Sequence, residues 1–107
     1  MPFQSFTAVP NRFLDLLLDS MSLGEVKVYL YILRRTVGFQ KLRDDISISQ
    51  FCHGTKKSDG TVLDNGTGMT RSSVIQALKL LELNGVIGCK CHPLKPSRPK
   101  TYWSNLQ

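Results

Sequence analysis

Long apolar runs, catalytic signatures and complete cysteine pairing are all missing from this chain of 107 residues. No stretch stays apolar over the roughly 20 residues that a membrane-spanning helix needs. The opening Met1-Pro2-Phe3-Gln4 lacks the basic start and apolar run of a signal peptide. There is no phosphate-binding glycine motif or nucleophile signature, and the acids are scattered, which argues against an enzyme. We therefore expect one small domain, located in the cytoplasm and without a membrane partner.

Cysteine is scarce, and an odd total of three is typical of reduced thiols rather than a disulfide framework. Cys52-His53 and Cys89-Lys90-Cys91-His92 do contain residue types that bind zinc. However, Cys-x-Cys lacks the gap of about two to four residues found in structural zinc sites, and two such thiols on a strand share one face as ordinary half-buried residues. We expect neither a metal nor another cofactor.

Acidic residues are nearly absent from the last third of the chain. After residue 70 there are six bases against the single acid Glu82, which leaves +5 of the formal net charge of +6, whereas residues 1–70 hold eight bases and seven acids. A basic excess confined to one part of a protein is typical of a surface that binds a polyanion. We expect double-stranded DNA as the partner, because a membrane-binding basic helix with aromatic anchors does not occur.

The best-bounded element is a helix predicted over residues 71–84. Thr70 can cap it by accepting from the amide of Ser72 or Ser73, and Gly85 can end it in the left-handed conformation. Its apolar positions are Val74, Ala77, Leu78 and Leu81. Because Arg and Lys bind guanine edges or phosphates and Gln binds adenine, the other face is expected to contact DNA through Thr70, Arg71, Ser72, Ser73, Gln76 and Lys79. An ordinary surface helix with a solvated polar face is the alternative.

A basic hairpin is predicted after this helix, over residues 86–104. Strands are expected near 86–91 and 100–104, and Pro93, Pro96 and Pro99 keep the tip from forming regular ladder bonds. We call this hairpin, residues 86–104, the wing. We expect it to contact phosphates or a minor groove through Lys90, Lys95, Arg98 and Lys100. A solvated basic loop is the alternative. Tyr102-Trp103 is expected to pack the second strand on the core.

Two helices are predicted near the N-terminus. The first opens at Pro10, and its buried side is expected to consist of Phe13, Leu14, Leu17, Leu18 and Met21. The second starts at the capping box Ser22 and Glu25 and is expected to end at Gly38 in the left-handed conformation. Its apolar stripe is Val26, Tyr29, Leu30 and Leu33. Arg34-Arg35 near its end is better explained as complementing the helix dipole than as a DNA contact.

Polar and apolar residues alternate over residues 44–49, as they do in a short half-buried strand. Ser49 can then cap a brief helix that runs to about Gly54. The full order is helix, helix, strand, helix, helix, strand, strand. That order predicts a mainly α fold with a small β-hairpin, namely a winged helix-turn-helix with an extra N-terminal helix, in which residues 71–84 are the recognition helix.

Residues 55–68 interrupt this pattern, because the connection inside a compact helix-turn-helix is about 3–4 residues long. The segment contains three glycines and the turn pairs Asp59-Gly60 and Asn65-Gly66. We expect a mobile loop or a small hairpin, and we interpret Lys56 and Lys57 as part of a tolerated insertion rather than as DNA contacts.

Five segments share a pattern with one known family. They are Phe6-Thr7-Ala8-Val9-Pro10-Asn11, Ser22-Leu23-Gly24-Glu25-Val26-Lys27-Val28, Arg34-Arg35-Thr36-Val37-Gly38-Phe39, Asp45-Ile46-Ser47-Ile48-Ser49-Gln50 and Thr67-Gly68-Met69-Thr70-Arg71-Ser72-Ser73-Val74. Together they resemble the N-terminal domain of the phage replication protein O family over about residues 6–88. The Val-Pro-Asn opening and the Arg-Arg-Thr-Val-Gly-Phe segment are its most specific parts. The resemblance implies binding of double-stranded DNA at a replication origin.

In that family, helicase loading is left to a C-terminal region. The chain stops at Gln107 without one, so a replicative helicase or its loader is expected to be contacted only through a region absent here. Self-association on repeated DNA sites is also expected. A transcriptional regulator would share every feature above, and a protein-interaction winged helix would leave the recognition face idle. We expect sequence-specific binding of double-stranded DNA, as the origin-binding domain of a phage-type replication initiator.

Overall fold

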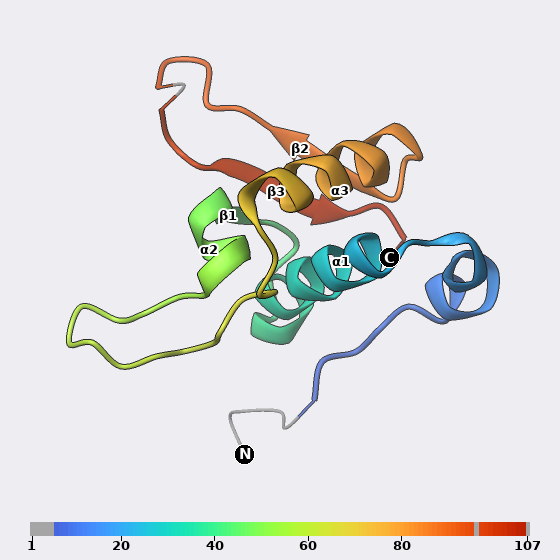
Figure 1. Cartoon of the computed structure of the whole chain (residues 1–107), viewed down its shortest axis with the longest axis horizontal. Helices are drawn as coiled ribbons and strands as arrows, with labels where there is room; N and C mark the ends of the chain where they lie inside the picture. The colour runs from blue at the N-terminus through green and yellow to red at the C-terminus, as the bar shows by residue number, and fades with distance from the viewer. Residues whose placement is uncertain (1–5, 96, 107) are drawn as a thin grey trace.

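The computed structural model describes residues 6–95 and 97–106. Two helices, α1 (Leu23–Arg35) and α3 (Arg71–Leu83), pack on each other and on a three-stranded antiparallel sheet (Figure 1). The full order is η1 (Phe13–Leu17), η2 (Leu18–Ser20), α1, η3 (Val37–Phe39), β1 (Asp44–Ile46), α2 (Ile48–His53), α3, β2 (Ile87–Lys90) and β3 (Lys100–Ser104). In the part of the chain described, no helix combines the length and the apolar character needed to cross a bilayer.

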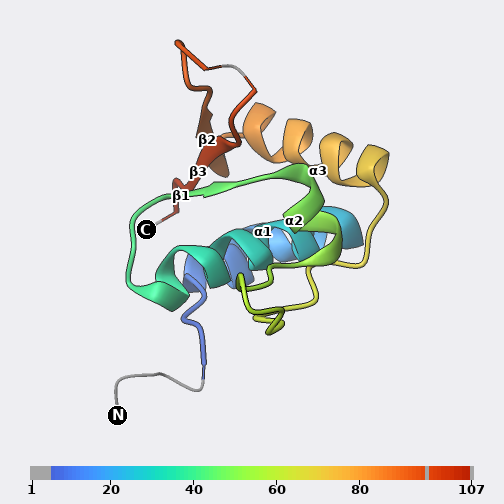
Figure 2. The same cartoon turned by 90° about the vertical axis from the view of Figure 1, so that its left-hand side faces the viewer.

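The sheet joins β1 (Asp44–Ile46), β2 (Ile87–Lys90) and β3 (Lys100–Ser104) in the order β1-β3-β2. The predicted hairpin of β2 and β3 is thus completed by the strand that precedes α2. Tyr102 is buried and its ring meets that of Phe51 edge-on, with centroids 5.3 Å apart, which confirms that the second strand packs on the core. In the view of Figure 2, the wing rises from this sheet beside α3.

The N-terminal helix differs from the prediction. Phe13–Leu17 (η1) form a π-helical turn and Leu18–Ser20 (η2) a 3-10 turn, instead of one continuous α-helix. A wide turn followed by a tight one breaks the 3.6-residue alignment, so Leu14 and Leu18 do not face the core. Phe13 is buried and Leu17 and Met21 pack against the core, but the prediction was wrong for Leu14 and Leu18, which are exposed.

The start of α1 is confirmed. The Ser22 hydroxyl accepts from the Glu25 amide, and the Glu25 carboxylate accepts from the Ser22 amide. The buried residues of the helix are Glu25, Val28, Tyr29, Tyr31, Ile32 and Leu33. Leu30 was predicted in the core but is exposed, because the buried residues of the helix centre on Ile32, and Leu30 lies about 160° around the helix from it.

The predicted end of this helix at a left-handed Gly38 is wrong. α1 ends at Arg35, a 3-10 turn (η3, Val37–Phe39) follows, and the left-handed residue is Gln40, with φ of 59°. Gly38 serves a different need. A Cβ there would come within 2.9 Å of both Arg34 Nη1 and Thr7 Oγ1, so the glycine permits a close approach of side chains.

The strand predicted over 44–49 is shorter, and α2 (Ile48–His53) begins earlier than expected. The cap is Ser47 rather than Ser49. Its hydroxyl accepts from the Gln50 amide while the Gln50 side chain accepts from the Ser47 amide. This capping box ends the strand at Ile46, because the Ser47 amide donates to the Gln50 side chain instead of to a neighbouring strand.

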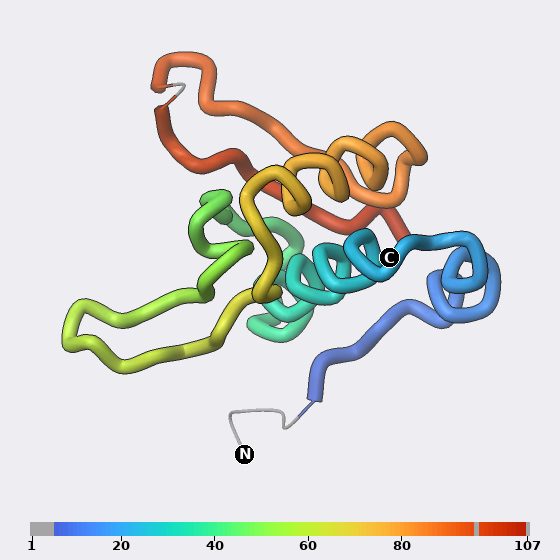
Figure 3. Tube along the Cα trace, in the orientation of Figure 1, coloured from blue at the N-terminus to red at the C-terminus, as the bar shows by residue number. Residues whose placement is uncertain are grey.

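Residues 55–68 form a small hairpin, one of the two forms predicted. Its chains meet at a bridge between Lys56 and Val62. At its base the backbone is closely packed, since a Cβ on Gly66 would lie 2.5 Å from the Gly54 nitrogen. The Thr67 amide donates to the Phe51 carbonyl at 2.8 Å, which attaches the returning chain to α2. The hairpin and the wing both project from the side of the molecule opposite residues 13–20 (Figure 3).

Candidate nucleic-acid interface

The polar face of α3 is built as the sequence predicted. Thr70 Oγ1 accepts from the Ser73 amide at 3.3 Å, and Gly85 has the left-handed φ of 74°. The predicted apolar positions Val74, Ala77, Leu78 and Leu81 are buried. All the α3 residues expected to contact DNA are exposed, namely Thr70, Arg71, Ser72, Ser73, Gln76 and Lys79.

This polar face covers only the first part of the helix. Toward its C-terminus the exposed positions include Leu80 and Leu83, and Leu83 is 80% exposed. A leucine can make apolar contacts but no hydrogen bonds to base edges. Apart from Glu82, the exposed hydrogen-bonding side chains of α3 therefore lie between Arg71 and Lys79.

A groove of about 520 Å³ lies between α3 and the wing. Its cationic lining comes from two sides. Arg71 and Lys79 belong to α3, and Arg98 and Lys100 belong to the wing. Glu82 is the single acid in the lining. The floor is apolar and contains Ile46, Ile75, Leu78 and Tyr102. An anionic chain lying in this groove would meet cations from both sides.

The other predicted contact residues lie outside that groove. Thr70, Ser73 and Gln76 line a second hollow of about 600 Å³ between α3 and the start of α1, where Lys27 is the cation. Lys90 ends β2 on the face away from α3, since the side chain before it, Cys89, contacts Glu82 of that helix. Lys95 lies at the wing tip. The structure thus brings four of the ten predicted residues into one groove.

The wing tip consists of two successive turns. The Lys95 amide donates to the His92 carbonyl at 3.2 Å, and the Arg98 amide donates to the Lys95 carbonyl at 3.0 Å. Pro93 is the second residue of the first turn and Pro99 follows the second; Pro96, the third proline predicted to shape the tip, lies outside the described residues. Leu94 in the first turn is 93% exposed.

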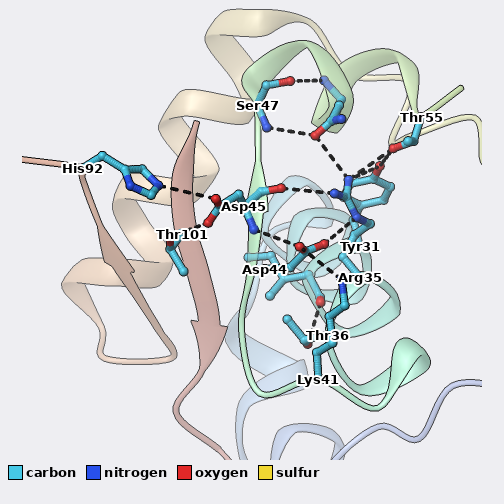
Figure 4. Close-up of polar contacts among 12 residues, drawn as sticks. Tyr31, Arg35, Thr36, Lys41, Asp44, Asp45, Ser47, Thr55, His92 and Thr101 are labelled. Carbon is cyan, nitrogen blue, oxygen red and sulfur yellow. Dashed lines mark hydrogen bonds and ion pairs between the residues drawn. The ribbon is translucent and has the colours of Figure 1, made fainter. Parts of the chain in front are cut away.

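The base of the wing is attached to β1 by Asp45 (Figure 4). The carboxylate accepts from the Thr101 hydroxyl and lies 3.4 Å from His92 Nε2. The hydrogen bond from Thr101, with the charges of His92 and Arg98, lowers the pKa of Asp45 against the opposing effect of partial burial. Sequence reasoning considered His92 only as a metal ligand and missed this pairing, because the partner lies 47 positions away in the chain.

The cysteines do not form a metal centre in the described ranges 6–95 and 97–106, where no group of three or more His, Cys, Asp and Glu side chains is placed to hold an ion. The Cys89 thiol donates to Glu82 at 3.4 Å. Burial raises the pKa of Cys89, and the neighbouring Glu82 raises it further. A protonated thiol next to a carboxylate is a poor metal ligand, because zinc binds the thiolate.

Arg35 holds the elements behind the groove in position (Figure 4). Its Nε donates to Asp44 Oδ2 at 2.9 Å, and its Nη2 donates to the Asp45 carbonyl at 3.1 Å. Nη1 lies within 3.4 Å of oxygen acceptors on Tyr31, Gln50 and Thr55. One guanidinium at the end of α1 therefore fixes β1, α2 and the start of the insertion. The helix-dipole interpretation had anticipated a structural role but not these partners.

No protein-family model, curated protein or solved structure matches this chain.

Proposed function

We propose that the chain is a winged helix that binds double-stranded DNA, with α3 in the major groove and the wing on the neighbouring backbone. The observation that carries this proposal is the groove in which Arg71, Lys79, Arg98 and Lys100 converge. Phosphates supply most of the affinity of DNA-binding proteins, and they are bound by clustered Arg and Lys side chains. The sheet order β1-β3-β2, with α2 and α3 between the first and second strands, supports the winged-helix assignment.

The shape and chemistry of α3 suit the major groove. A thirteen-residue helix is about 20 Å long, and the groove is about 12 Å wide and admits one helix. Ser72 and Ser73 are small, so the start of the helix can approach a phosphate closely. Gln76 and Lys79 are exposed and follow in the next turns, where they can reach base edges.

We further propose that the DNA site is a replication origin, on the basis of the resemblance to the phage replication protein O family. The most specific segment of that resemblance has a structural role in this chain. Arg35 fastens three elements, the Thr36 hydroxyl donates to the Ile32 carbonyl at 2.8 Å, and Gly38 permits a close contact. The proposal of a shared framework is therefore supported by a segment that has a structural role in this chain.

The test is a titration of a fluorescently labelled duplex at several salt concentrations. If about 4–6 of the clustered Lys and Arg side chains contact phosphates, log affinity should fall against log salt with a slope of roughly −4 to −5. The double variant Arg98→Ala with Lys100→Ala should flatten the slope by about two units. Lys56→Ala with Lys57→Ala is the matched control, since it removes the same charge from the insertion and should leave the slope unchanged. A wild-type slope near zero would remove the proposal.

The same duplexes can separate base reading from phosphate binding. Gln76→Ala and Lys79→Ala should alter which sequences a random library enriches, whereas the wing variants should weaken all sequences alike. Each lost base contact should reduce discrimination by about 1–3 kcal/mol. An unchanged preference in both helix variants would show that α3 does not read bases.

A further inference from the structure

Leu94 is the most exposed of the large apolar side chains in the described part of the chain. Single exposed leucines are common on protein surfaces and need no explanation by themselves. Leu94 differs from the others in its place, because it lies in the connection between β2 and β3, at the tip of the projecting wing. Lys95 follows it directly, and Arg98 lies in the next turn.

The wing tip holds Leu94 on a preformed support. Pro93 precedes it and has a fixed φ, and the turn is closed by the hydrogen bond from the Lys95 amide to the His92 carbonyl. His92 itself is attached to the sheet through Asp45, which also accepts from Thr101. An apolar side chain on such a support loses little conformational freedom when it enters a binding site.

The groove beside the wing sets where Leu94 would lie on a duplex. Arg98 and Lys100 line the groove from the wing side, opposite Arg71 and Lys79 of α3. If a DNA backbone occupies this groove and α3 lies in the major groove, the wing tip reaches the far side of that backbone. The next groove of the duplex on that side is a minor groove.

We propose that Leu94 is a minor-groove wedge, which inserts between two base pairs and bends the duplex while Lys95 and Arg98 hold the flanking phosphates. This inference rests on the proposed binding of double-stranded DNA. Apolar side chains, leucine among them, partly unstack a base step when inserted from the minor groove and kink the duplex by about 20–90°. Pyrimidine–purine steps such as TA unstack most readily, so the wedge also favours sites with such a step beneath the wing.

The experiment measures bending by energy transfer between dyes at the two ends of a duplex of about 24 base pairs with a central TA step. Wild-type protein should bring the dyes closer, and 2-aminopurine at that step should brighten as it unstacks. Leu94→Ala should abolish both signals and leave the salt slope unchanged, because no phosphate contact is lost. Leu94→Met should retain both signals, since methionine can also act as a wedge.

Leu42→Ala is the matched control, because Leu42 is 82% exposed and lies just before β1 rather than on the wing. It should bend DNA as the wild type does. Bending that persists in Leu94→Ala, or wild-type binding without bending, would overturn the wedge and leave the proposed DNA binding intact. A wild-type protein that binds no duplex at all would overturn the proposed function and the wedge together.

Discussion

Arg35 shows how much one residue can organise in a domain of this size. Its side chain is 12% exposed and donates to acceptors on five other residues, two of them on β1. The planar guanidinium suits this arrangement because it presents donors in several fixed directions at once, which the single ammonium of lysine cannot do. The position of β1, and through it the wing base at Asp45, therefore depends on a residue outside the proposed DNA-binding surface.

Replacing Arg35 should destabilise the fold strongly. Arg35→Ala removes the nearest cation from the Asp44 carboxylate, which keeps only the more distant Lys41 at 3.6 Å, and removes the donor that joins α1 to β1 and α2, so we expect a loss of about 3 kcal/mol in the free energy of unfolding. Arg35→Lys should recover only a small part of this. Urea unfolding followed by circular dichroism gives both values. Arg34→Ala is the neighbouring control, since Arg34 is exposed and stacks on Phe39 at 4.4 Å, and it should cost less than about 1 kcal/mol. Similar losses for Arg34 and Arg35 would contradict the role of the network.

At the scale of elements, local signals in the sequence were sufficient wherever a helix has its own cap and stop. Thr70 and Gly85 bound α3 as predicted, and the capping box at Ser22 starts α1 as predicted. Local signals gave wrong predictions where packing between distant parts of the chain determines the backbone conformation. Gly38 suggested a left-handed stop, but its lack of a Cβ instead makes room for Thr7, whose hydroxyl would lie 2.9 Å from a Cβ there and which is 31 positions away in the chain. Likewise, the periodicity of residues 13–21 could not show that two unlike turns replace one α-helix.

The insertion offers a prediction at this scale. Gly66 has φ of 70° and no room for a Cβ, whereas Gly60 at the hairpin tip has φ of 90° and no atom within 4 Å of the position that a Cβ would take. Gly66→Ala must both strain its backbone and displace the chain at Gly54, so we expect a loss of at least about 2 kcal/mol. Gly60→Ala carries only the backbone strain, of about 1 kcal/mol, which the exposed tip can relax.

Urea unfolding gives the two losses, and amide exchange localises them. The Thr67 amide, which donates to the Phe51 carbonyl, should exchange faster in Gly66→Ala and at the wild-type rate in Gly60→Ala. Equal effects of the two substitutions would mean that the base of the hairpin is not a tight junction.

For the whole molecule, the charge distribution could be read from the sequence, but the groove could not. Counting the charged residues along the chain identified Arg71, Lys79, Arg98 and Lys100 as members of one basic region. Their convergence depends on β3 lying between β1 and β2, which places the wing beside α3. The pairing of His92 with Asp45 depends on the same topology. Residue types and local periodicity carry the first kind of information, whereas strand order is a property of the folded chain.

A domain that reads DNA with one helix, as we propose for α3, contacts only a short stretch of base pairs, so a single copy offers limited sequence discrimination. Repeated sites would overcome this limit. The Cα trace measures 41 × 38 × 25 Å, and one helical turn of DNA rises about 34–36 Å. Copies two turns apart would therefore lie on the same side of the duplex without overlapping, whereas copies one turn apart fit only with the shortest axis of the molecule along the duplex. We predict that an unbiased binding selection on fragmented phage and host DNA recovers sites repeated at multiples of about 10.5 base pairs. Footprinting of a recovered fragment should then show protection with that period. A single isolated site upstream of a gene would contradict the origin assignment and favour a transcriptional regulator, while leaving the proposed use of α3 and the wing unchanged.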